Sequence, residues 1–126
     1  MARELKIFSM LLIVFAFSAY ASPLSLKGAG KNLKFKPNKS GVMIFSSSLN
    51  SEAENGLKSL TAEKIKQLLQ KMNDQRVAPS VRLCGGLGAK VWVLEDENKT
   101  EWSVCEFSDG SAVLTDDLGK IIQKFQ

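Results

Sequence analysis

The chain contains only two cysteines, Cys84 and Cys105. An even pair of cysteines in a small domain that reaches an oxidising compartment most simply forms a disulfide. One alternative is a metal site, but it would need further ligands and the chain has no histidine. The other is a redox pair, but the Cys-x-x-Cys spacing of such a pair is absent. We therefore predict a structural disulfide between Cys84 and Cys105. It should stabilise the folded state by about 3 kcal/mol, because closing this loop lowers the entropy of the unfolded chain.

The amino terminus has the three parts of a secretory signal peptide. Two basic residues are followed by an uncharged apolar run at 7–17, and residues 18–21 (SAYA) place small side chains where signal peptidase reads them. A membrane-spanning helix needs about 20 apolar residues, so this run is too short to stay as an anchor. We expect cleavage of the signal peptide, residues 1–21, after Ala21, and a secreted or periplasmic protein without a transmembrane anchor.

Charge is distributed unevenly along the rest of the chain. Residues 22–50 hold five lysines and no acidic residue, although the net charge of the whole chain is only +4. Because proline and glycine are interspersed, we interpret residues 22–41 as a basic flexible segment that precedes a single domain, residues 42–126. The alternative is a segment that docks on an anionic surface such as lipid or a wall polymer. The candidate contacts are then Lys27, Lys31, Lys34, Lys36 and Lys39.

One amphipathic helix is predicted between Thr61 and Met72, with Thr61 as a suitable N-cap. Apolar residues recur there at spacings of three and four, and residues 51–59 show a weaker, ambiguous helical pattern. The stripe consists of Ile65, Leu68, Leu69 and Met72. An apolar stripe of this kind packs either into the core of the domain or against a binding partner. We expect the core, because a small domain has few other sources of burial.

The last third of the chain is predicted to form strands. Residues 89–94 and 101–107 are rich in β-branched and aromatic side chains, and a polar turn separates them. Asp109-Gly110 marks a second tight turn before a third strand at 112–114, and 42–45 has the length of a buried strand. The expected fold is α+β: a small antiparallel sheet, made of the C-terminal hairpin and a third strand, with one main amphipathic helix packed on it and one disulfide.

The register of the hairpin decides which side chains lie beside the disulfide. With Asn98-Lys99 at the tip, Trp92 lies opposite Cys105, and a slip of one residue would reverse the faces. Trp92 and Trp102 then face opposite sides, so Trp102 is a candidate partner contact. The alternative is that both tryptophans are buried. The exposed turn contributes further candidate contacts: Glu95, Asp96, Glu97, Asn98 and Lys99.

The sequence contains no recognisable catalytic set. Without histidine, Ser–His and Cys–His arrangements are excluded. The three acids of the polar turn are better explained as solubilising residues than as catalytic carboxylates. We therefore expect no enzymatic activity, no cofactor and no metal. Nucleic acid is also a poor partner, because the basic segment has a single aromatic residue, Phe35, on which bases could stack.

A motif pattern extends over residues 79–111. Pro79-Ser80-Val81 leads to Cys84 and its glycines, and after a β-rich spacer the segment 105–111 reads Cys-Glu-Phe-Ser-Asp-Gly-Ser. This pattern resembles a small domain of unknown function in bacterial exported proteins and lipoproteins, which often carries the label haemolysin. In that family proline is usual at the position of Ser108, and a further cysteine and tryptophan follow. The resemblance implies a disulfide-bearing β module of the bacterial envelope and no known activity.

These observations predict a non-enzymatic binding module that is exported to the bacterial envelope or the extracellular space. Its partner would be another protein or an anionic envelope component. The alternative is an inhibitor of a secreted hydrolase, either a lysozyme or a protease. In that case the acidic hairpin turn is the preorganised element that meets the enzyme.

Overall fold

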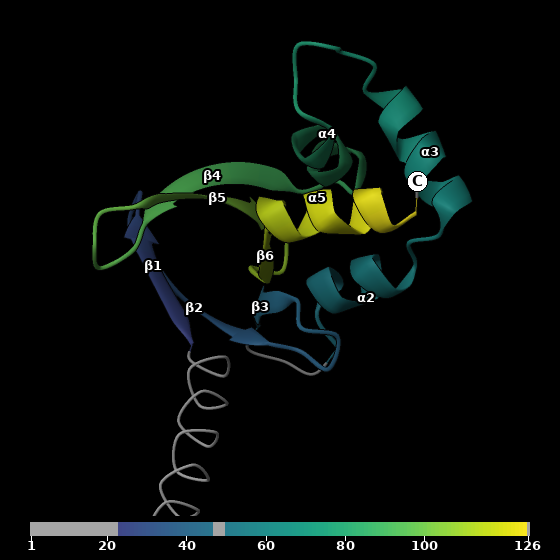
Figure 1. Cartoon of the computed structure of the whole chain (residues 1–126). Coiled ribbons are helices and arrows are strands. Elements are labelled where there is room, and N and C mark those ends of the chain that lie inside the picture. Colours follow the sequence, from purple (N-terminus) through teal and green to yellow (C-terminus); the bar gives the residue numbers. More distant parts are fainter. Residues whose placement is uncertain (1–22, 47–49, 126) are drawn as a thin grey trace, which may run out of the picture.

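The computed structural model describes residues 23–46 and 50–125, so the predicted signal peptide lies outside the described residues. Six strands form a closed antiparallel barrel, and the helices gather on one side of it (Figure 1). The strands are β1 (Leu24–Gly28), β2 (Lys31–Pro37), β3 (Met43–Phe45), β4 (Lys90–Glu95), β5 (Glu101–Glu106) and β6 (Ala112–Leu114). The helices of the described residues are α2 (Glu52–Lys58), α3 (Ala62–Lys71), α4 (Pro79–Gly86) and α5 (Thr115–Lys124).

The closed barrel corrects the expected small sheet with one main helix. Its strands follow the order β1-β2-β3-β6-β5-β4, and the Lys27–Glu95 pair joins β1 to β4. The predicted hairpin and third strand are present as β4, β5 and β6, and the run at 42–45 contains β3. The strands that complete the barrel come from the segment that was expected to be a flexible linker.

Strands β1 and β2 form a hairpin inside that segment. Leu26, Leu33 and Phe35 face inward and are buried, whereas Lys27, Lys34 and Lys36 face solvent. Apolar residues at every second position are the pattern of a strand with one buried face. A two-residue turn, Ala29-Gly30, connects the strands with positive φ at both positions (49° and 74°), as a type I′ turn requires.

The barrel wall separates two hydrophobic cores. One core fills the barrel and consists of Leu26, Leu33, Phe35, Leu94, Val104, Ala112 and Leu114. The other lies between the wall and the helices, and its members include Ile44, Leu83, Cys84, Cys105, Val113, Leu118 and Ile122. Successive residues of a strand point to opposite faces, so Val104 enters the first core and Cys105 enters the second. Both are fully buried.

The predicted disulfide between Cys84 and Cys105 is confirmed. It joins α4 to β5 across a Cα–Cα distance of 5.8 Å, and both cysteines are fully buried in the core between helices and barrel. The bond therefore fixes α4 against the barrel wall.

The predicted helix at 61–72 is confirmed as α3. Thr61 is its N-cap and accepts a hydrogen bond from the backbone N–H of Lys64 at 3.1 Å. Ile65 and Leu68 are buried as expected, but Met72 is the C-cap and is 43% exposed. The ambiguous pattern before it is helix α2, whose N-cap Ser51 accepts from the backbone of Glu54 at 3.2 Å.

The predicted register of the β4–β5 hairpin is wrong by one residue. Trp92 lies opposite Val104, and Leu94 lies opposite Trp102. Lys99 adopts positive φ (62°), and its N–H donates to the Asp96 carbonyl at 3.0 Å. This is a type I turn followed by a bulge, which adds a residue and shifts the pairing. Both tryptophans consequently share the inner face of the barrel.

Candidate binding groove

A groove of about 940 Å³ lies between the β2–β3 loop, α2 and α5. In Figure 1, α2 and α5 lie on the same side of the barrel, near the carboxyl end of the chain. The loop contributes Pro37, Asn38, Lys39, Ser40, Gly41 and Val42. The helices and the residues that follow them contribute Glu54, Leu57, Lys58, Leu60, Asp117, Lys120, Ile121, Lys124 and Phe125.

The loop wall is held in shape by Asn38. Its side-chain oxygen accepts hydrogen bonds from the backbone N–H groups of Ser40 and Val42, both at 2.9 Å. Asp117 of α5 accepts from the backbone N–H of Met43 at 3.0 Å, which ties the end of this loop to the opposite wall. The two walls are therefore connected through side-chain hydrogen bonds.

Apolar side chains line the groove between its charged residues. Val42 comes from the loop, Leu57 and Leu60 from α2 and the residues after it, and Ile121 from α5. Leu60 is buried, whereas Val42, Leu57 and Ile121 are half-buried. Phe125 follows α5 and is 43% exposed, although a ring of this size is usually covered.

Four exposed lysines surround the apolar lining: Lys39, Lys58, Lys120 and Lys124. The two acids of the groove are already engaged. Glu54 lies 3.8 Å from Lys58, and Asp117 lies 4.0 Å from Lys120. Within the part of the chain that the structure describes, Lys39 and Lys124 make no ion pair. The groove therefore carries an excess of positive charge that no side chain of the described residues neutralises.

A second hollow of about 390 Å³ continues the groove along β2 and shares Pro37, Asn38 and Glu54 with it. It adds Lys34 and Lys36, whose side chains lie on the outer face of β2. Three of the five lysines that the sequence singled out, including Lys39, are thus brought together with lysines from two helices. We call the two hollows with their six lysines the lysine groove.

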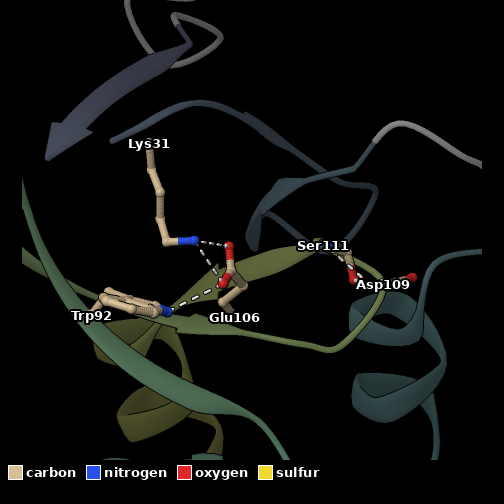
Figure 2. A network of polar contacts seen from close by, with 5 residues as sticks. All are labelled: Lys31, Trp92, Glu106, Asp109 and Ser111. Carbon is tan, nitrogen blue, oxygen red and sulfur yellow. Dashed lines mark hydrogen bonds and ion pairs between the residues drawn. The ribbon is translucent and has the colours of Figure 1, made fainter. Parts of the chain in front are cut away.

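The other two singled-out lysines lie elsewhere. Lys27 pairs with Glu95 in the backbone register of the barrel seam. Lys31 is part of an inner polar cluster, in which its Nζ lies 3.0 Å from Glu106 Oε1 and 4.6 Å from the centroid of the Trp92 ring. Trp92 Nε1 also donates to Glu106 Oε1 at 3.1 Å, so Glu106 lies between the two residues (Figure 2). With its charge matched in this way, Lys31 contributes little to a contact with an anionic partner.

The tip of the β4–β5 hairpin is organised by Asp96. Its Oδ1 accepts from the backbone N–H groups of Asn98 and Thr100 at 2.8 and 3.0 Å, and its Oδ2 accepts from Trp102 Nε1 at 3.1 Å. The hydrogen bond from Trp102, followed by those from the backbone, lowers the pKa of Asp96 below its usual value. Glu95, Glu97, Asn98 and Lys99 are exposed around this rigid centre, whereas Trp102 is half-buried on the inner face.

Sequence reasoning missed the helical half of the lysine groove. Lys58, Lys120, Lys124 and the apolar residues beside them come from two helices that are distant from β2 in the chain. The available signal is weak: Lys120 and Lys124 lie one turn apart with Ile121 between them, a pattern common on any solvated helix face.

No group of three potential metal ligands occurs within residues 23–46 and 50–125. Over the same ranges, no helix has both the length and the apolar character needed to cross a membrane. In comparisons with known proteins, no family model, no curated protein and no solved structure matches the chain.

Proposed function

We propose that this protein is an exported, non-enzymatic binding module that holds an anionic ligand in the lysine groove. The observation that carries the proposal is the arrangement of six lysines around a partly apolar hollow whose two acids, Glu54 and Asp117, are already paired. The resemblance of residues 79–111 to an exported bacterial domain and the predicted signal peptide supply the envelope or extracellular setting.

The physical argument is electrostatic. Clustered charges of one sign in a concave surface raise the local concentration of oppositely charged ligands and speed their association. Exposed charges are screened beyond about 8 Å at physiological ionic strength, so the binding should weaken as salt is added. Because Lys39 and Lys124 have no acidic partner among the described residues, they have more to gain from an anion than Lys58 and Lys120, which each lie near an acid of their own helix.

A charge-reversal experiment tests the proposal. The purified protein and its Lys39→Glu/Lys124→Glu variant are titrated with dodecyl phosphate, with polyphosphate and with vesicles of phosphatidylglycerol. We expect at least one probe to bind in a salt-sensitive manner, and the variant to bind it about tenfold more weakly. Lys66→Glu/Lys71→Glu, on the exposed side of α3, is the matched control. Equal loss in both variants, or no binding by any probe, would refute the proposal.

A second candidate function is inhibition of a secreted hydrolase. The rigid hairpin tip favours it, because a preorganised loop loses little conformational entropy when it enters an active site. Its exposed acids, Glu95 and Glu97, would suit a basic enzyme such as a lysozyme. Assays against a panel of lysozymes and proteases test this candidate, with Glu97→Lys as the loop variant. It fails if micromolar protein inhibits none of them.

A further inference from the structure

We infer that the ligand of the lysine groove is a single-chain anionic amphiphile, a molecule with one acyl or alkyl chain and a carboxylate or phosphate head group. The inference rests on the proposed function and adds the chemical class of the ligand. Charge alone does not account for the groove, because its lining alternates between lysines and apolar side chains. A ligand with a charged head group and an apolar chain is complementary to both kinds of side chain.

The apolar part of the lining is the first step of the argument. Leu57 and Ile121 come from different helices and line the same groove, and Phe125 lies beside them with 43% of its surface exposed. A purely ionic ligand, such as a phosphate polymer, would leave these side chains in contact with water. An aliphatic chain along them removes their apolar surface from water, and this is favourable in proportion to the area covered.

The head group is placed by the unpaired lysines. Lys58 and Lys120 each lie near an acid of their own helix, at 3.8 and 4.0 Å. Lys39, on the loop wall, and Lys124, at the end of α5, make no ion pair within the described residues. A carboxylate or phosphate near these two lysines forms charge-assisted hydrogen bonds without displacing an existing partner.

The shape of the groove favours a single molecule over a membrane surface. A volume of about 940 Å³ lies within the range of small-molecule sites, roughly 300–1,000 Å³. A protein that binds at a membrane surface presents apolar side chains on a face that inserts between the lipids. Here Leu57, Leu60 and Ile121 line a hollow between two walls and are buried or half-buried, so they do not form a protruding apolar face of that kind.

The experiment compares probes that separate chain from charge, by calorimetry below the micellar concentration of each amphiphile. Dodecyl phosphate and dodecanoate have both features, dodecylphosphocholine has the chain without net charge, and inorganic phosphate and polyphosphate have the charge without the chain. We expect saturable binding of the first two, with affinities about tenfold or more above those of the other three. Vesicles of phosphatidylglycerol form a separate arm.

Two variants assign the contacts. Phe125→Gln and Ile121→Gln should weaken the binding of dodecyl phosphate about tenfold. Val93→Gln, at a 58% exposed apolar residue of β4 outside the groove, should leave it unchanged. Circular dichroism and the urea midpoint verify that each variant is folded. If Ile121→Gln is unfolded, the exposed Phe125 position still provides the test.

The outcomes separate this inference from the proposed function. If polyphosphate binds as tightly as dodecyl phosphate and Phe125→Gln has no effect, the chain is not recognised. The inference then falls while the proposal of an anion-binding module stands. If only the vesicles bind, the ligand is a membrane surface and the inference is again wrong. If no anion binds in any arm, both fall.

Discussion

Asp109, in the β5–β6 turn, accepts a hydrogen bond at 2.8 Å from the backbone N–H of Glu52, the first residue of α2. Ser111 from the same turn accepts from the backbone N–H of Ala53 at 3.0 Å, and the N-cap Ser51 accepts from Glu54. Figure 2 shows Asp109 and Ser111 adjacent in the turn, where they are hydrogen-bonded to each other. The Asp-Gly-Ser turn thus caps and positions α2, which is one wall of the lysine groove.

Removal of this carboxylate should destabilise the protein. We expect Asp109→Ala to lower the free energy of unfolding by about 1 kcal/mol, the usual cost of losing a helix cap. Urea unfolding at neutral pH measures the change. Glu97→Ala, which removes an exposed carboxylate of the β4–β5 turn, is the control and should change the value by less than about 0.5 kcal/mol. Equal effects of the two substitutions would contradict the capping role.

The same carboxylate should make stability depend on acid pH. The hydrogen bond from the Glu52 backbone, followed by that from the Ser111 hydroxyl, lowers the pKa of Asp109 below its ordinary 3.8. A group with a lowered pKa in the folded state stabilises above its unfolded-state pKa and loses this effect as pH falls through the folded-state value. The stabilising effect is therefore complete at neutral pH and declines below about pH 4.

Urea unfolding between about pH 7 and pH 2 checks this expectation. The decline should be shallower in Asp109→Asn, which cannot ionise, than in the unmodified protein. It should not vanish, because hydrogen bonds also lower the pKa of Asp96 and of Asp74. Parallel pH profiles for the two proteins would show that Asp109 does not contribute.

The turn between β1 and β2 offers a stabilising substitution. Ala29 has φ of 49°, a conformation that disfavours residues with a side chain but is accepted by asparagine in type I′ turns. Ala29→Asn should therefore raise the free energy of unfolding by about 0.5 kcal/mol. Gly30→Ala, at φ of 74°, should lower it by about 1 kcal/mol, because it introduces the strain that glycine avoids. If both substitutions shift the thermal midpoint in the same direction, the turn assignment is wrong.

Local patterns predicted the parts of the fold that local chemistry decides. The stripe with Thr61 as its cap gave helix α3, and the two β-rich runs gave β4 and β5. The disulfide followed from the cysteine count. Strands β1 and β2 were missed because lysine is frequent in them and glycine and proline occur at their ends, while the alternation of Leu33 and Phe35 with lysines covers only a few residues.

Other features depend on geometry that no local pattern contains. A single bulge at Lys99 reversed the predicted faces of the hairpin and placed Trp102 on the inner side. The lysine groove joins a loop and two helices, so its lysines are neighbours only after the barrel has closed. Gly85 and Gly86, which follow Cys84, lie in α4, where they allow this helix to approach α3 closely.

These two glycines should respond differently to replacement by alanine. A Cβ at Gly86 would lie 3.1 Å from Leu68 Cβ and 3.2 Å from the Leu68 carbonyl oxygen, and the backbone of α3 cannot yield. A Cβ at Gly85 would meet the end of the Met72 side chain, which is partly exposed and free to move aside. We expect Gly86→Ala to lower the free energy of unfolding by about 1–2 kcal/mol through overpacking. Gly85→Ala should change it by less than about 0.5 kcal/mol, because helix propensity offsets the displaced methionine. Urea unfolding of both variants measures the difference. If Gly85→Ala lowers the free energy of unfolding more than Gly86→Ala does, α3 and α4 are not in close contact at Leu68.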